Sequence, residues 1–145
     1  MAIYFGDGSN TSTGRIVKVS TVSVSGQFLT SSGSFTKHSD LKIDFACSDS
    51  NNTVLILATC AADGQSSQAF VSMFVDDVHQ LNTEGFGASQ ASARSLSAFQ
   101  FKHAPGNTSS HEYALAVRKG SGSGNVEVPP WGTGNQSITA IEVAV

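Results

Sequence analysis

The residue types most often used to bind metals are scattered through this sequence. The four histidines are His38, His79, His103 and His111, and no two of them stand four residues apart as they do in a zinc-binding helix. No Cys-x-x-Cys pair is present either. His38 precedes Ser39 and Asp40 beside an expected strand start, where a solvated turn is the better interpretation than a metal ligand. The sequence therefore predicts no metal site.

Acidic and nucleophilic residues form no recognisable catalytic motif. Asp76 and Asp77 are adjacent, so on extended backbone they would point to opposite faces, and a turn suits them better than a carboxylate pair. No Gly-x-Ser-x-Gly elbow singles out one of the 23 serines as a nucleophile. The glycine-rich run at 120–124 lacks the Gly-x-Gly-x-x-Gly pattern of a nucleotide cradle. We expect no catalytic residues, no cofactor and no enzymatic activity; a pocket lined by acids of shifted pKa would revive that hypothesis.

Trp131 is the one aromatic residue with a plausible exposed role, because it lies in a Pro-Pro-Trp-Gly loop that cannot join a central sheet. Two interpretations stay open for it, a plug over the end of the fold and a surface contact. Five other aromatic residues fall at strand spacing and are expected in the core: Phe28, Phe70, Phe74, Phe99 and Phe101.

Composition excludes several classes of protein. The 145 residues suit one domain, and the charged fraction of 13% is about half of the ~25% of an average globular chain. Plentiful Phe, Val, Ile and Leu argue against disorder, and the low content of Glu and Lys argues against a coiled coil. A net charge of −3 disfavours nucleic-acid binding. No run approaches the ~20 apolar residues of a membrane span, and residues 1–7 lack the features of a secretory signal.

The elements predicted from hydrophobic periodicity are short strands. Residues 41–47 alternate cleanly, whereas residues 53–60 are apolar on both faces, which predicts a central strand that is covered on both sides. A phase slip between 16 and 24 indicates a bulge near Ser20 and Thr21. Asp76-Asp77 and the glycine-rich run at 120–124 are expected to be hairpin turns.

About eight to ten such strands, with turn signals every 8–15 residues, predict an antiparallel β-sandwich or barrel. Cys47 and Cys60 lie in apolar strand-like runs. Two buried free thiols are the simpler interpretation, and a disulfide between neighbouring strands stays open.

Several segments resemble a β-sandwich domain of phage virion proteins, found in head decoration, head-fibre and tail-fibre tip proteins of marine bacteriophages. The opening Met-Ala-Ile-Tyr-Phe-Gly-Asp-Gly, with residues 14–19, is similar to the start of such proteins. Similar segments follow at 50–57, 70–81 and 95–128. Residues 134–144 give the most specific match, to a terminal Ser-x-Ile-Thr-x-Met/Leu-Glu strand; Asp76-Asp77 departs from the family, which tends to carry a glycine there.

The resemblance implies a jelly-roll-like sandwich that works as a homotrimer on a virion, made in the host cytoplasm without a signal peptide. Residues 15–145 would form the β-sandwich domain. Residues 1–14, with Ile3, Tyr4 and Phe5, would be an arm for attachment or subunit contact. The faces of strands not needed for the core, such as Phe99 with Phe101 or the C-terminal strand, are where a subunit interface is expected.

Two functions compete on this basis. The first is a trimeric capsid decoration, cement or head-fibre protein whose partners are the major capsid protein or other virion proteins. The second is a tail-fibre tip that recognises a host-surface glycan, with Trp131 and Asn135 as candidate contacts, because sugar faces stack on aromatic rings while hydroxyls bond amides. Neither function involves nucleic acid or a membrane.

Overall fold

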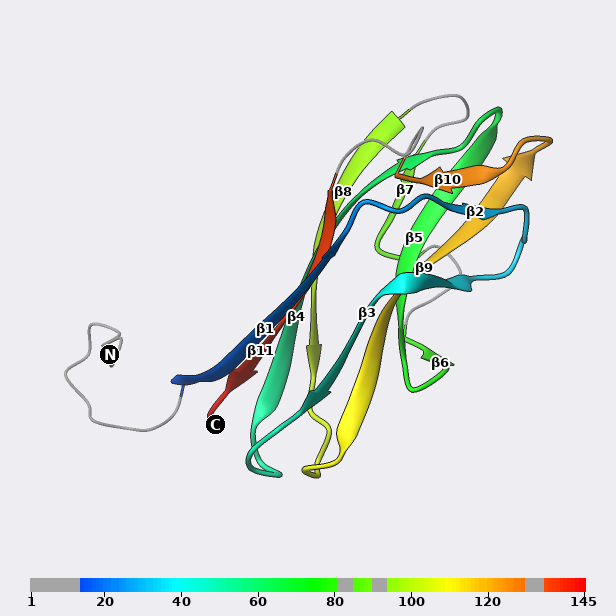
Figure 1. Cartoon of the computed structure of the whole chain (residues 1–145). Helices are drawn as coiled ribbons and strands as arrows, with labels where there is room; N and C mark the ends of the chain where they lie inside the picture. The colour runs from blue at the N-terminus through cyan, green and yellow to red at the C-terminus, as the bar shows by residue number, and fades with distance from the viewer. Residues whose placement is uncertain (1–13, 81–84, 90–93, 130–134) are drawn as a thin grey trace.

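The computed structural model describes residues 14–80, 85–89, 94–129 and 135–145, and these residues form eleven strands in two antiparallel sheets (Figure 1). The six-stranded sheet contains β1 (Ile16–Val24), β2 (Phe28–Thr30), β4 (Thr53–Asp63), β8 (Arg94–His103), β10 (Val126–Val128) and β11 (Gln136–Val143). The five-stranded sheet contains β3 (Thr36–Ala46), β5 (Ser67–Val75), β6 (Val78–His79), β7 (Gly87–Ser89) and β9 (Ser110–Gly122). The predicted antiparallel sandwich is confirmed. No helix able to cross a membrane occurs in the described ranges.

Strand β4 organises the larger sheet. Strand β8 pairs with it along one edge, from Val54 to Asp63, while β11 and then β10 pair along the other edge. Strand β1 extends the sheet beyond β11, and β2 extends it beyond β10. In the smaller sheet, β9 lies between β3 and β5, and the short strands β6 and β7 share the remaining edge of β5.

The core lies between the two sheets and takes alternate residues from the long strands. Its largest apolar side chains are almost completely buried: Leu41, Phe45, Ile56, Met73, Leu115 and Ile138, with Tyr113 beside them. The cleanest alternation in the sequence is confirmed here, because Leu41, Ile43, Phe45 and Cys47 all face the core. Cys47 and Cys60 are buried free thiols, as the simpler interpretation predicted.

The prediction that residues 53–60 are covered on both faces is wrong in part. Strand β4 is central within its sheet, but of residues 53–60 only Val54, Ile56, Ala58 and Cys60 are buried. The alternate residues point away from the core, and Leu57 is 39% exposed. The apolar content of the second face therefore lies on the molecular surface.

Two local predictions are corrected by the strand pairing. The bulge in β1 lies between Ile16 and Lys18, where the register against β11 shifts, whereas the pairing through Ser20 and Thr21 is regular. The glycine-rich run at 120–124 is no hairpin tip, because β9 and β10 belong to different sheets. A Cβ atom at Gly124 would overlap the carbonyl of Gln65, so the chain needs glycine where it crosses between the sheets.

The aromatic residues expected in the core divide between two places. Phe28, Phe99 and Phe101 are partly buried against the core, with Phe99 stacked on Phe86 at 4.2 Å between ring centroids. Phe70 and Phe74 lie instead on the outer face of the five-stranded sheet, because they alternate with the core residues Val71 and Met73 along β5.

The turn predicted at Asp76-Asp77 is confirmed and joins β5 to β6. Both residues adopt left-handed backbone conformations, with φ of +48° and +68°, which is the geometry of a tight hairpin turn. Aspartate tolerates this region better than most residues, and here its side chains have partners. Asp76 accepts a hydrogen bond from the backbone N–H of Glu112, and Asp77 pairs with Lys37.

Alanine substitutions at two adjacent residues of β4 should distinguish its buried face from its exposed face, because they should lower the free energy of unfolding by different amounts. We expect Ile56→Ala to lower the free energy of unfolding by about 2–5 kcal/mol, because it removes fully buried methylenes. Leu57→Ala, its neighbour on the surface, should lower it by less than about 1 kcal/mol in the isolated subunit. Urea denaturation of both variants at low protein concentration gives the comparison, and equal losses would contradict one-sided coverage of β4.

Candidate assembly surface

The outer face of the six-stranded sheet is formed by residues that alternate with the core. It carries short hydroxyl and aliphatic side chains from four adjacent strands, and we call it the outer β-face. Its members are Val19, Thr21, Ser23, Leu55, Leu57, Thr59, Leu96, Ala98, Ser137, Thr139 and Ile141.

Cross-strand pairing arranges these side chains in rows. Val19 lies opposite Ile141, which lies opposite Leu55 on the next strand. In the adjacent row, Thr139 lies between Thr21 and Leu57. Each row therefore runs across the strands as a continuous ridge of similar height, as the side chains of directly paired residues do in any regular sheet.

Hydroxyl groups on the outer β-face are bonded to one another. The Oγ1 atoms of Thr21 and Thr139 are 2.9 Å apart, as are Thr59 Oγ1 and Ser137 Oγ. These contacts restrict rotamers before any partner arrives, and short side chains lose little entropy on burial. The surface is thus largely preordered.

Two longer polar side chains of β8 complete these rows, Gln100 opposite Leu57 and Lys102 opposite Leu55, and Lys102 is the one charged side chain of the face within the described residues. Large aliphatic side chains are open to solvent here, with Leu96 78% and Val19 54% exposed. Depletion of charge together with exposed aliphatic groups is typical of the centre of a protein–protein interface.

The edges of the same sheet are open within the described chain. Among the described strands, β1 pairs only with β11, and β8 pairs only with β4. An unpaired strand edge can add a strand from another chain. The bulge at Val17 interrupts the pairing of β1 with β11 at one end, and the pairing is regular from Lys18 to Val24.

The outer face of the five-stranded sheet has a different character. Its aromatic residues cover one another and are capped by a cation: Phe35 stacks on His79 at 4.3 Å, and the Arg118 guanidinium lies 3.9 Å from the centre of the Phe70 ring. Lys42 and Lys37 bond the two carboxylate oxygens of Glu112, at 2.7 and 2.6 Å. The charged and aromatic groups of this face already have partners on the same face. The outer β-face is therefore the better candidate for assembly.

The histidines are held by local hydrogen bonds. His38 is buried in β3, which corrects the solvated turn expected from the sequence, and its Nδ1 accepts bonds from the backbone N–H groups of Asp40 and Leu41. His103 Nδ1 lies 2.8 Å from the hydroxyl of Tyr113.

His111 has acceptors at both ring nitrogens, Asp76 at 2.5 Å and the amide oxygen of Asn107 at 3.2 Å. Hydrogen bonds of Asn107 to Pro105 and Ser109 fix the orientation of its amide. His111 therefore links the β5–β6 turn to the segment before β9.

The described residues contain no group of three or more His, Cys, Asp or Glu side chains that could hold a metal ion. Burial raises the pKa of the Cys60 thiol to about 12, so this cysteine is not poised as a nucleophile.

Of the site residues predicted from the sequence, Asn135 is the one that lies in the described chain. Ile3, Tyr4, Phe5 and Trp131 lie outside the described residues. Asn135 is described and exposed just before β11, while Gly14 bonds Ala144 just after β11. Since β11 has eight residues, these two points are separated by about 25 Å along the strand.

The sequence pointed to two places for a subunit interface, Phe99 with Phe101 and the C-terminal strand. The structure corrects the first of them. Phe99 and Phe101 point toward the core side and contact Phe86, so they are not an exposed apolar face. The C-terminal strand does expose Thr139 and Ile141 on the outer β-face, whereas Val19 and Leu57 were missed. Residues 53–60 are apolar on both faces of their strand, so the sequence alone could not show which face is buried.

Comparison with known proteins does not identify a family for this chain. No family model matches the sequence, and no curated protein matches it.

Stability should fall as the pH is lowered from 7.5 to 5. Burial holds the pKa of His38 below its ordinary value of 6.5, and burial together with the charge of His111 does the same for His103. The unfolded chain therefore takes up protons first as the pH falls through 6.5, which favours unfolding. The lowered pKa values of Asp76, Glu112 and Glu142 act only below about 4.5, where stability from these carboxylates is lost.

Urea denaturation at pH 7.5, 6.5 and 5.0 measures this effect. The His103→Gln variant should show a smaller decrease between pH 7.5 and 5.0 than the unmodified protein does. Equal or higher stability of the unmodified protein at pH 5.0 would contradict the buried neutral histidines.

Proposed function

We propose that this protein is a non-enzymatic structural protein of a phage virion, a capsid decoration, cement or head-fibre protein that works as a homotrimer with a jelly-roll-like sandwich. The observation that supports the assembly role is the outer β-face, with its exposed aliphatic side chains and a single charged side chain, Lys102, in the described chain. The virion assignment rests on the sequence resemblance, above all at residues 134–144.

The outer β-face is large enough to form part of a subunit interface, but further buried area must come from elsewhere on the chain. Four strands about 4.8 Å apart and about seven residues long cover roughly 20 Å by 23 Å, or about 450 Å². A standard interface buries about 800 Å² on each partner. The rest would come from the open edge of β1 and from residues 1–14.

The two ends of the sandwich suit an attached surface protein. The arm of residues 1–14 leaves beside the end of β11, so it would reach the capsid from one end. Asn135 lies at the other end, which would face outward. The tail-fibre alternative, recognition of a host-surface glycan through Trp131 and Asn135, stays a second candidate and would use the outward end at Asn135.

Charge placed on the outer β-face should block assembly without unfolding the subunit. We expect the unmodified protein to have a native mass of about 45 kDa, three times the 15.0 kDa of the chain. Leu57→Lys should give a 15.0 kDa species, because a lysine there would be buried without a partner in the interface. Ser39→Lys, at an exposed position on β3, is the matched control and should leave the trimer intact.

Native mass spectrometry and circular dichroism provide the readouts. A folded Leu57→Lys variant that still forms trimers would exclude this face from the interface, and a monomeric unmodified protein would contradict the trimer.

Removal of residues 1–13 should abolish attachment to the particle while the sandwich stays folded. Gly14 is kept because its backbone N–H donates to the carbonyl of Ala144 and closes the end of the sheet. Co-sedimentation with particles that lack this protein measures attachment, and thermal denaturation checks the fold. Unchanged occupancy of the particle would contradict the role of the arm.

A further inference from the structure

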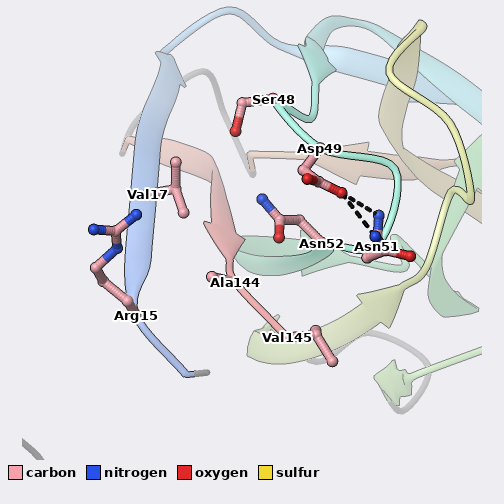
Figure 2. Close-up of a pocket in the computed structure, with 8 residues that line it drawn as sticks. All are labelled: Arg15, Val17, Ser48, Asp49, Asn51, Asn52, Ala144 and Val145. Carbon is pink, nitrogen blue, oxygen red and sulfur yellow. Dashed lines mark hydrogen bonds between the residues drawn. The ribbon is translucent and has the colours of Figure 1, made fainter. Parts of the chain in front are cut away.

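A polar pocket of about 340 Å³ opens at the end of the sandwich where β1 begins and β11 ends (Figure 2). Arg15 and Val17 form one wall, and the β3–β4 turn with Asp49 and Asn52 forms the opposite wall. The volume lies at the lower end of the ~300–1,000 Å³ of small-molecule sites. None of these residues belongs to the outer β-face.

A buried carboxylate holds the wall of this pocket in place. Glu142 is fully buried, and its Oε1 accepts bonds from Ser48 N–H at 2.7 Å, Ser48 Oγ at 2.7 Å and Asn52 Nδ2 at 2.6 Å. Burial alone would raise the pKa of Glu142, but these bonds outweigh it and the pKa lies below its ordinary value. The ionised Glu142 therefore orders Ser48 and Asn52 before any ligand binds, which reduces the entropy lost on binding.

Two acceptor oxygens on this wall are left for a ligand. Both hydrogen bonds from Asn51 fall on Asp49 Oδ1, so Oδ2 has no partner among the described residues. The amide nitrogen of Asn52 is committed to Glu142, and its Oδ1 therefore points the other way, toward the side of Ala144 (Figure 2). Asn52 is only 7% exposed, so this oxygen is held by a buried side chain.

The facing wall supplies donors and apolar surface. Arg15 has no ion pair in the described part of the chain; its guanidinium lies beside β1 in Figure 2, on the side away from Asp49, and would donate to a ligand after a rotamer change. Val17 and Ala144 add aliphatic groups beside it. The charged side chains that line the pocket, Arg15 and Asp49, are opposite in sign, so the lining side chains suit a neutral ligand that both donates and accepts hydrogen bonds.

We propose that this pocket binds one neutral sugar unit, whose vicinal hydroxyls would donate to Asp49 Oδ2 and Asn52 Oδ1 and accept from Arg15. The C–H groups of the sugar would contact Val17 and Ala144. This site goes beyond the proposed structural function and differs from the contact expected at Trp131 and Asn135, because Asn135 lies at the opposite end of β11. An extended arm of 13 residues reaches up to ~45 Å, so attachment through it leaves room for a ligand here.

Saturation-transfer NMR of the full chain with the methyl glycosides of glucose, galactose, mannose and N-acetylglucosamine tests the site. We expect at least one of them to bind with a millimolar Kd. Asp49→Asn, which keeps an acceptor for Asn51, and Arg15→Ala should each weaken binding at least tenfold. Asp44→Asn, at an exposed position on β3 away from the pocket, is the matched control and should bind as the unmodified protein does.

Three results would overturn the proposal. The first is no signal from any of the four glycosides, and the second is equal binding by the Asp49→Asn variant. The third is binding of Ca²⁺ alone, seen as calcium-dependent shifts of Asp49 and Asn52 resonances with no effect of sugar. The oligomeric state is measured separately, so failure of the sugar site leaves the proposed assembly role unaffected.

Discussion

Strand β4 pairs along both of its edges but is covered on only one of its two faces, and the rest of the structure depends on this constraint. Successive side chains point to opposite sides of a strand, so Ile56 enters the core while Leu57 must point outward. The neighbouring strands follow the same alternation because their register is fixed against β4. The core and the outer β-face are therefore two sides of one sheet.

Hydrogen-bonded polar groups inside the sandwich fix the ends of the sheets. At one end, Glu142 ties the β3–β4 turn to β11 through Ser48 and Asn52. Near the other end of β11, the side chain of Gln136 lies beside the buried ring of His38. Buried polar groups of this kind are costly unless they are hydrogen bonded, so they favour one register of the strands over its alternatives.

The same polar contacts link the fold to its two proposed activities. By fixing β11, they hold Thr139 and Ile141 in line with the neighbouring strands on the outer β-face. By fixing the β3–β4 turn, Glu142 also shapes the pocket beside Arg15. Assembly and ligand binding would thus use different surfaces of one rigid sheet.

The sequence was sufficient to predict the all-β sandwich, the turn at Asp76-Asp77 and the core face of residues 41–47, because these depend on local periodicity and turn chemistry. It could not show whether the second apolar face of residues 53–60 is covered, since coverage depends on the other layer. The segment at 120–124, where the chain crosses from one sheet to the other, was wrongly predicted to be a hairpin turn, because glycine is common in both kinds of connection. The burial of His38 depends on backbone partners that no residue pattern reveals.

Glu142 and the pocket beside it were beyond prediction for a related reason. An isolated glutamate in an alternating strand is expected to face solvent, whereas its partners Ser48 and Asn52 lie about ninety residues earlier in the chain. Threonine and serine stand at alternate positions of β1 and β11, a pattern typical of the solvent-facing side of a sheet. Their arrangement in rows with Leu57 appears only once the register is known.

The central claim is that the outer β-face is covered by another subunit in solution. Hydroxyl-radical footprinting of the intact protein tests it directly, because the rate of side-chain oxidation follows exposure to solvent. Leu96 and Val78 are 78% and 62% exposed in the single chain, and they lie on different sheets. The account predicts strong protection of Leu96 and Leu57 and rapid oxidation of Val78. Oxidation of Leu96 at the rate of Val78 would show that the face is open and would contradict the account.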